Sequence, residues 1–262
     1  MTIGRRFKER ERNKEKHATK SSIIKRTVFI RFIQLILIIC MMWSLIYIIK
    51  WLKENRKSNQ IKSNIDKSVT MDENNKYTVD FDALINLNKD VVAWLKVNNT
   101  NIEYPVVQAD NNDYYLYHSF DRTENGAGWI FLDYRNKIEG KDKNIVIYGH
   151  NRKDGSMFGT LNKVLQKEWY QNKDNQTIKL ITKNGEMNYQ IFSVYQIENE
   201  EYYIKTSFNN NLEFKDFLEK IKSRSIYNFE TETDENSQIL TLSTCGASNK
   251  YRVVVHAKKI ND

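Results

Sequence analysis

The sequence has only two cysteines, Cys40 and Cys245, and this scarcity excludes several classes of site. Cys40 lies in an apolar run, so a domain folded outside the membrane would hold Cys245 without an intramolecular disulfide partner. Paired-ligand spacings such as C-x-x-C or H-E-x-x-H are missing, as are a glycine-rich phosphate loop and a G-x-S-x-G turn. We therefore predict that the protein uses no metal and no cofactor.

An excess of charge is also absent from most of the chain, although its net charge is +8. Residues 1–31 contain eleven lysines and arginines against three glutamates, and the 30 basic and 30 acidic residues that follow cancel. The basic character therefore belongs to the N-terminal tail and does not indicate a nucleic-acid-binding domain. Beside an apolar run, such a tail is typical of a cytoplasmic flank that meets anionic lipid headgroups.

Residues 32–49, FIQLILIICMMWSLIYII, form an uncharged run that is long enough to span a bilayer as a helix. A secretory signal peptide would have a shorter apolar region that ends in a small-residue cleavage site, and no such site follows this run. Trp43, Tyr47 and Trp51 suit a membrane–water interface. We predict one signal-anchor helix over residues 32–52, with the tail 1–31 in the cytoplasm and the rest of the chain outside.

Beyond the anchor, the composition predicts a stalk and then one folded domain. Residues 53–76 are polar and charged with hardly any apolar side chains, which is typical of a solvated, partly helical stalk. Residues 77–262 have the size of a single domain. This domain should begin with a helix that Asp80 or Asp82 caps and that has one apolar face. The members of that face are Phe81, Leu84, Ile85, Val92 and Leu95.

The rest of the domain is dominated by short segments rich in β-branched and aromatic residues, separated by Asn, Gly and Lys turns. A second helix is predicted over residues 212–223, where apolar residues recur at helical spacing. Many short strands with few helices indicate a mainly β fold, either a barrel or a sandwich. The predicted strands cover residues 102–107, 128–133, 144–149, 177–182, 187–197, 201–206, 238–244 and 251–260.

Cys245 follows the alternating strand LTLST and precedes the small loop GASN. An unpaired cysteine in an exported domain is an intermolecular bridge, a buried inert thiol or a reactive thiol. A hairpin of the last two strands would fold Arg252 back towards the thiol, where a guanidinium can stabilise an oxyanion, although a solvated rim arginine is common. His150 ends the strand NIVIYG and could be a general acid or a loop residue. His118 has no partner signal, and His256 is interpreted as a strand-face residue.

The order of these residues resembles that of sortases, the cysteine transpeptidases of Gram-positive surfaces. TLSTC, followed by an arginine that heads the last strand, resembles the sortase signature, and YGHN…GSMFGTL (148–161) is similar to the histidine segment of class B sortases. YPVVQADNNDYYLYHSF (104–120) and YYIKTSF…FKDFLEKIKSRS before the last two strands are also similar to that class. The resemblance covers the domain from about residue 77.

This resemblance implies an eight-stranded sortase-type β-barrel with N-terminal helices and one helix inserted before the last two strands. It implies that Cys245 attacks the threonine carbonyl of a sorting motif in a secreted protein, usually of the Asn-Pro-x-Thr kind. His150 would protonate the leaving amine and Arg252 would hold the oxyanion. An amine of a peptidoglycan cross-bridge or its lipid-linked precursor would resolve the thioacyl-enzyme. By matching positions, the peptide groove would be lined by Asn112, Leu116, Tyr203, Ile204 and Ser243.

Some class B relatives have a longer, acidic loop between the nucleophile and the arginine, whereas GASNKY contains no acidic residue. A Cys-His-acid triad that draws on this loop is therefore not supported. Among other wall-acting cysteine enzymes, an L,D-transpeptidase would show a Ser-His-Gly-Cys type motif, and a papain-like peptidase would place cysteine before histidine. A non-catalytic, membrane-tethered binding module is the alternative from a different class of function.

Overall fold

The structure, a computed structural model, describes residues 3–71, 77–198, 200–245 and 250–260. The chain divides into two compact units, Met1–Lys53 and Glu54–Asp262, and helix α1 (Ile3–Ile65) begins in the first and ends in the second. Among the described residues, α1 is the one helix that is long and apolar enough to cross a membrane. Its large apolar side chains between Val28 and Leu52 are exposed, which suits a lipid environment better than water.

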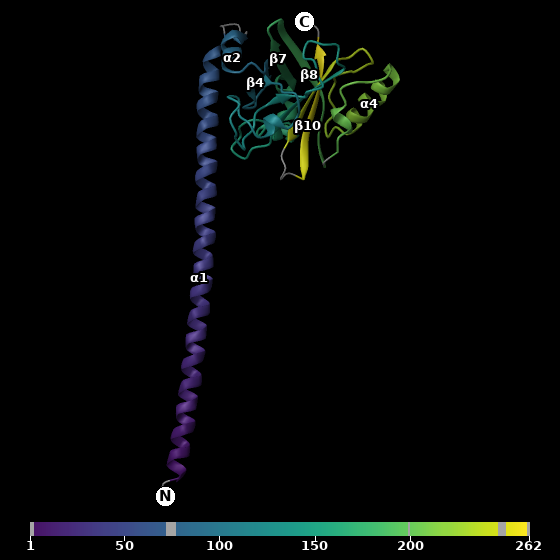
Figure 1. The fold of residues 1–262 in the computed structure, drawn as a ribbon. Helices are drawn as coiled ribbons and strands as arrows, with labels where there is room; N and C mark the ends of the chain where they lie inside the picture. Colours follow the sequence, from purple (N-terminus) through teal and green to yellow (C-terminus); the bar gives the residue numbers. More distant parts are fainter. Residues whose placement is uncertain (1–2, 72–76, 199, 246–249, 261–262) are drawn as a thin grey trace. The chain divides into compact units, whose positions relative to one another are not determined.

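The second unit is built on a β-barrel (Figure 1). Its strands are β3 (Val91–Val97), β4 (Glu103–Val107), β5 (Phe131–Leu132), β6 (Asn144–His150), β7 (Thr177–Thr182), β8 (Gly185–Glu198), β9 (Ile239–Cys245) and β10 (Tyr251–Ile260). Within the described residues these eight strands close in the order β10-β8-β7-β3-β4-β5-β6-β9. The pairs β4–β5 and β6–β9 are parallel, and the other neighbours are antiparallel. The mainly β, barrel-type fold predicted from the sequence is confirmed.

The remaining elements lie in the connections of the barrel and before its first strand. The two-stranded sheet consists of β1 (Val69–Met71) and β2 (Tyr77–Val79), which pair in antiparallel fashion. The α-helices of the domain are α2 (Phe81–Leu87), α3 (Lys167–Gln171) and α4 (Asn211–Ser223). The 3-10 helices are η1 (Asp66–Ser68), η2 (Tyr114–Leu116), η3 (Leu161–Leu165), η4 (Lys173–Gln176) and η5 (Tyr202–Ile204).

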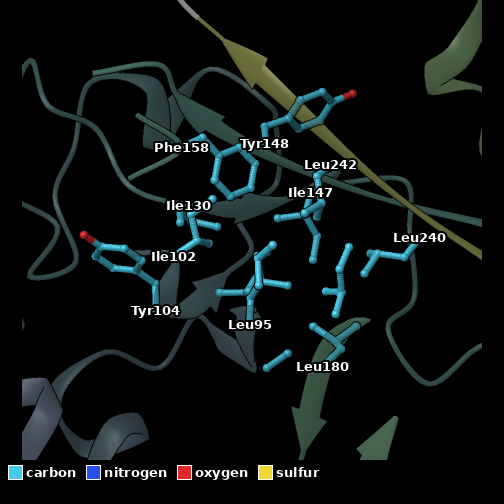
Figure 2. Packing of buried hydrophobic residues seen from close by; sticks show 14 of the residues in the cluster. Leu95, Ile102, Tyr104, Ile130, Ile147, Tyr148, Phe158, Leu180, Leu240 and Leu242 are labelled. Atoms are coloured by element: carbon cyan, nitrogen blue, oxygen red, sulfur yellow. The ribbon is translucent and has the colours of Figure 1, made fainter. Parts of the chain in front are cut away.

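Alternate residues of the strands fill the barrel with branched aliphatic side chains. Leu95, Leu180, Leu240 and Leu242 are fully buried, and Figure 2 shows them pointing toward one another in the interior. The hydroxyl of Tyr148 points away from this cluster in the same view, so one end of the ring is apolar and the other reaches a polar environment. The packed interior gives β6 and β9 a rigid support for the residues at their ends.

Helix α4 covers the outer face of part of the barrel. Its apolar residues Phe214, Phe217, Leu218 and Ile221 are buried in a second cluster with side chains of β8, β9 and β10. The side chain of Asn210 caps the helix by accepting a hydrogen bond from the Glu213 backbone N–H at 2.9 Å. The predicted helix over 212–223 is therefore confirmed, and both faces of strand β9 are covered.

The predicted helix with an apolar face from Phe81 to Leu95 is wrong beyond Leu87. The Asp80 side chain caps α2 as expected, but Asn88 ends it, because Asn88 Oδ1 accepts from the backbone N–H of Asp90 at 2.9 Å. This local bond competes with helix continuation. The β-branched pair that follows enters β3, which pairs with β4 and β7 and supplies a barrel strand that the sequence did not predict.

The strand predicted over residues 201–206 is also wrong, because the segment forms the short helix η5. Both edges of β8 are already occupied by β7 and β10. The carbonyl groups of the segment are satisfied by side chains instead: Asn144 Nδ2 donates to the Tyr203 and Lys205 carbonyls at 3.2 and 2.9 Å. Carbonyl groups that accept from side chains do not have to pair with a neighbouring strand.

The expectation of a solvated stalk over residues 53–76 fails for its first part. Residues 54–65 continue α1 inside the second compact unit, and Ser58 and Ile65 are buried. Ile65 joins the main hydrophobic cluster of the barrel. Residues 72–76 lie outside the described residues.

Candidate active site

The parallel pairing of β6 and β9 brings together two of the residues singled out in the sequence. The register runs from Asn144 opposite Ile239 to His150 opposite Cys245, so both strands end at the same edge of the barrel. The pairing extends one residue further, because the Asn151 N–H donates to the Cys245 carbonyl at 3.3 Å. A histidine and a thiol that end neighbouring parallel strands face the same end of the barrel.

Cys245 is nearly enclosed, with 9 % of its surface exposed, and Sγ lies 4.0 Å from the Ser243 carbonyl. Burial raises the pKa of its thiol to about 12, while the Arg252 charge and a backbone hydrogen bond with Gly149 act in the lowering direction. Without a substrate the side chain is therefore a neutral thiol at pH 7. The thiol is buried, and a reactive thiol in this environment needs a proton acceptor nearby.

His150 is half-buried, and its ring is fixed by a hydrogen bond of 2.9 Å from Nε2 to the Leu116 carbonyl. A carbonyl only accepts, so Nε2 carries the hydrogen and the neutral ring keeps its lone pair on Nδ1. Burial lowers the pKa of the imidazole, the bond to Leu116 opposes this, and the charge of Arg152 lowers it further. At neutral pH the ring is uncharged and can accept a proton.

Arg252 is the second residue of β10 and is partly buried, opposite Ile197 of β8. On its other side, the pairing of β10 with β9 is described from Val254 opposite Ser243, and the same register two residues earlier brings Arg252 alongside Cys245. The guanidinium charge lowers the pKa of the Cys245 thiol, which places it within electrostatic reach of the sulfur. The loop GASN at 246–249 lies outside the described residues.

Two of the predicted groove residues meet beside the thiol. Ser243 lies on the same face of β9 as Cys245, and the hydroxyl groups of Ser243 and Tyr203 are 3.0 Å apart. Burial raises the pKa of Tyr203, and the bond to Ser243 and the charge of Arg252 oppose the rise. Ile204 follows in η5 and is partly buried against both hydrophobic clusters. This group forms one side of the candidate groove.

Asn112 and Leu116 lie on a different segment, in and just before η2. Leu116 presents its carbonyl to His150, and the Asn112 amide is held at both ends. Its Nδ2 donates to Asp133 Oδ2 at 3.0 Å, and its Oδ1 accepts from the Tyr134 N–H at 3.0 Å. The predicted groove residues therefore fall into two groups, one from η2 and one from η5 and β9.

A buried carboxylate that the sequence reasoning missed joins these two groups. Asp133 is fully buried, and its oxygens accept from Arg135 Nε and Nη2 at 2.8 and 2.6 Å, from the Tyr148 hydroxyl at 2.8 Å and from Asn112. Arg135 Nη2 also donates to the Ile204 carbonyl at 3.0 Å. The acid two residues before an arginine in FLDYRN was the available signal. Asp133 and Arg135 together fix both sides of the candidate groove.

The other two histidines of the domain have structural partners. His118 stacks on the Tyr114 ring, and its Nδ1 lies 2.7 Å from the Tyr114 carbonyl. His256 is fully buried, 2.8 Å from both the Thr241 hydroxyl and the Tyr195 hydroxyl, and burial lowers its pKa to about 3. In the parts of the chain that the structure describes, no group of three His, Cys, Asp or Glu side chains is placed to hold a metal ion.

The chain was compared with family models, with curated proteins and with solved structures. A family model described as "Sortase domain" matches residues 95–260. "Sortase B" of Listeria monocytogenes is 41 % identical over 177 residues, which is 66 % of this chain and 71 % of the relative. A sortase B structure from B. anthracis, in complex with AAEK1, is similar with a TM-score of 0.70 and 38 % identity, covering 80 % of this chain and 98 % of that one. The Staphylococcus aureus sortase B–substrate complex has a TM-score of 0.66 and 31 % identity, covering 80 % and 94 %.

Proposed function

Because this chain belongs to the sortase family, as a class B member and a cysteine transpeptidase, we propose that it joins secreted proteins to a peptidoglycan amine. It would do so by cleaving a C-terminal sorting motif of the Asn-Pro-x-Thr type. The observation that carries the proposal is the register of β6 and β9, which sets His150 opposite Cys245. An amine of a peptidoglycan cross-bridge, or of its lipid-linked precursor, is the acceptor.

The mechanism begins from an uncharged pair, because burial raises the pKa of the Cys245 thiol and lowers that of His150. The thiol proton passes to His150 Nδ1 as sulfur attacks the threonine carbonyl of the motif. Arg252 donates hydrogen bonds to the oxygen that becomes negative, which stabilises the tetrahedral intermediate. His150 then gives its proton to the leaving amine, and a thioacyl-enzyme remains on Cys245. The acceptor amine attacks that thioester and restores the thiol.

The groove for the motif is proposed to run between the η2 group and the group on η5 and β9. Asn112 and Leu116 would contact the peptide from one side, and Tyr203, Ile204 and Ser243 from the other. The support for this is that Asp133 and Arg135 hold Asn112 and the Ile204 carbonyl in one hydrogen-bonded set. A side chain fixed before binding loses little entropy when it contacts a ligand.

The location follows from the proposed acceptor and from helix α1. The tail 1–31 lies in the cytoplasm, residues 32–52 cross the membrane once, and the catalytic domain 77–262 is outside. The eleven basic residues of the tail support this orientation. Sorting substrates arrive at the outer membrane surface, so an anchored enzyme meets both the substrate and a lipid-linked acceptor there.

The experiment uses the full chain in detergent micelles with an Asn-Pro-x-Thr peptide and a nucleophilic amine. We expect a thioacyl adduct on Cys245 by mass spectrometry and an amide product, with both absent in Cys245→Ala. A peptide with the threonine replaced by valine is the matched substrate control. Product formation by the Cys245→Ala variant would contradict the proposal, and an untouched peptide across a library of related motifs would favour the binding module.

A further inference from the structure

Residues 54–58 begin the part of α1 that belongs to the second compact unit, and they contact the loop Asn125–Gly128. Ser58 is 6 % exposed and Asn125 is 2 % exposed, so the two meet in a buried contact. Asn125 Nδ2 donates to the Ser58 hydroxyl at 3.0 Å and to the Glu54 carbonyl at 3.4 Å. Buried amide groups with specific partners hold one relative position, because any shift leaves a polar group unpaired.

A second contact from the same helical turn reaches the segment that follows the histidine. Arg152 Nη2 donates to the Asn55 side-chain oxygen, and the same guanidinium pairs with Asp154 at 2.8 Å. Arg152 lies two residues after His150, and the Phe158 N–H donates to the His150 carbonyl at 3.0 Å. Residues 54–58 are therefore tied to both the Asn125 loop and the chain next to the candidate general acid.

The Asn125 loop itself is closed by its own hydrogen bonds. The Asn125 N–H donates to the Tyr117 carbonyl at 2.8 Å, and the Asn125 carbonyl accepts from the Gly128 N–H at 3.0 Å. The side-chain oxygen of Asn125 accepts from the Ala127 N–H at 2.9 Å. Since the side-chain nitrogen is bonded to α1, every polar group of Asn125 has a partner, and a shift of the loop relative to the helix would break at least one of these bonds.

Gly128, at the end of the Asn125 loop, lies beside the imidazole of His150. Its φ of +59° is in the left-handed region, and a Cβ there would lie 2.6 Å from Cδ2 of His150 and 2.9 Å from the Leu116 carbonyl oxygen. Only glycine fits this position. The space beside Gly128 is therefore too narrow for any side chain, because the ring of His150 and the carbonyl that accepts from its Nε2 already border it.

We propose that residues 54–58 are a positioning segment for His150: through Ser58 and Asn125 they hold Gly128 against the imidazole, and through Asn55 they hold Arg152. The segment does not touch the reacting atoms. The inference rests on the role proposed above for His150 as the proton carrier. Residues 54–58, just beyond the predicted membrane span, would therefore position His150 as well as link the domain to its anchor.

The test compares variants of the full chain in detergent micelles, with transpeptidation of the sorting-motif peptide as the activity. Ser58→Ala removes the shorter of the two Asn125 bonds to α1, Asn55→Ala removes the bond from Arg152, and the double variant removes both while the Lys57–Asp121 ion pair at 3.0 Å remains. Asn59→Ala is the matched control, because Asn59 is exposed in the same turn. Asn55→Asp keeps an oxygen acceptor for Arg152 and serves as the conservative rescue.

We expect kcat to fall by about fivefold in Ser58→Ala, which loses one neutral hydrogen bond, and by at least as much in Asn55→Ala, which loses a bond from a charged guanidinium, with KM within about twofold of the wild type. Asn59→Ala and Asn55→Asp should retain the wild-type kcat. In long-range proton–nitrogen spectra of histidine-labelled protein, His150 should show a single Nε2–H form in the wild type and lose that uniform signature in the double variant.

An unchanged kcat together with unchanged His150 signals in the double variant would overturn the inference. A fall in kcat that only follows the loss of folded protein, measured by thermal unfolding, would also overturn it, because the segment would then be structural. If the wild type forms no product, the proposed function fails, and the His150 signals still decide whether residues 54–58 hold the ring.

Discussion

Replacing Asp133 with asparagine tests whether the two sides of the candidate groove depend on one buried charge. Oδ1 of Asp133 accepts from the backbone N–H and Nε of Arg135 at 3.0 and 2.8 Å. Oδ2 accepts from Arg135 Nη2, Asn112 and the Tyr148 hydroxyl. Asparagine has the same shape but replaces one oxygen with an NH2 group. Whichever way the amide turns, that group meets donors where it needs an acceptor.

The expected loss of stability follows from these contacts. Hydrogen bonds to a charged group contribute about 1.5–3 kcal/mol each, and removing one partner of a buried ion pair costs about 3–5 kcal/mol. Arg135 is 38 % exposed at its side chain, so water compensates part of that loss. We therefore expect Asp133→Asn to lower the free energy of unfolding by about 3 kcal/mol at pH 7. Tyr148→Phe should lower it by about 2 kcal/mol, because its hydroxyl donates to the charged carboxylate.

The loss of stability in Asp133→Asn should become smaller as the pH is lowered. Burial would raise the pKa of Asp133, but hydrogen bonds from Arg135 and from the Tyr148 hydroxyl outweigh it and hold the pKa below its ordinary value. A carboxyl group with a lowered folded-state pKa contributes its full stability above the unfolded-state value of about 3.9 and loses it as the pH falls through the folded-state pKa. The difference between wild type and Asp133→Asn should therefore shrink below about pH 4.

The assay is urea unfolding of residues 54–262, followed by tryptophan fluorescence, because Trp94 and Trp129 are fully buried and report the barrel. Combining Asp133→Asn with Tyr148→Phe should show a coupling, since the two side chains share a bond. A loss below about 1 kcal/mol at pH 7 would refute the reasoning, because it is smaller than one hydrogen bond to a charged group. A difference that stays constant down to pH 3 would refute it as well.

Two other changes probe single residues of the same region. Arg252→Lys keeps the charge but loses the planar fork, so kcat should fall about a hundredfold in the peptide assay with KM little changed; an unaltered kcat would exclude Arg252 as the oxyanion donor. Burial lowers the pKa of His256 to about 3, so the unfolded state binds one more proton than the folded state between about pH 6.5 and 3. As the pH is lowered through that window, His256 should decrease the free energy of unfolding by about 1.4 kcal/mol per pH unit, and urea unfolding of His256→Gln should lack this contribution.

The strands that carry alternating or β-branched runs could be predicted from the sequence alone, and β7 and β10 match their predicted bounds. The two errors had different physical causes. The boundary at Asn88 is set by a side-chain bond to the backbone, which periodicity does not contain. The segment Tyr202–Ile204 has the composition of a strand but finds Asn144 and Arg135 as partners, which come from distant parts of the chain.

For the candidate site, the sequence predicted that His150 and Cys245 end strands, but not that these strands are neighbours. Sequence order placed His150 and Cys245 at the ends of two strands, but their opposition depends on the parallel pairing of β6 with β9, two strands far apart in the sequence. The role of Asp133 could not be predicted, because its partners lie on η2, on β6 and in the following turn. The predicted groove residues remain a prediction; the structure places Asn112 and Leu116 in and just before η2, and Tyr203, Ile204 and Ser243 on η5 and β9.

The chemistry of the site depends on how two uncharged groups become a charged pair. A buried thiol with a pKa of about 12 holds very little thiolate at neutral pH, and the Arg252 charge offsets only part of the burial. In the proposed mechanism, transfer of the thiol proton to His150 would create both charges at the ends of neighbouring strands, and their attraction is strong where the dielectric constant is low. That gain depends steeply on the position of the ring. The hydrogen bond that the Leu116 carbonyl accepts from His150, and the positioning proposed for residues 54–58, would therefore affect the rate.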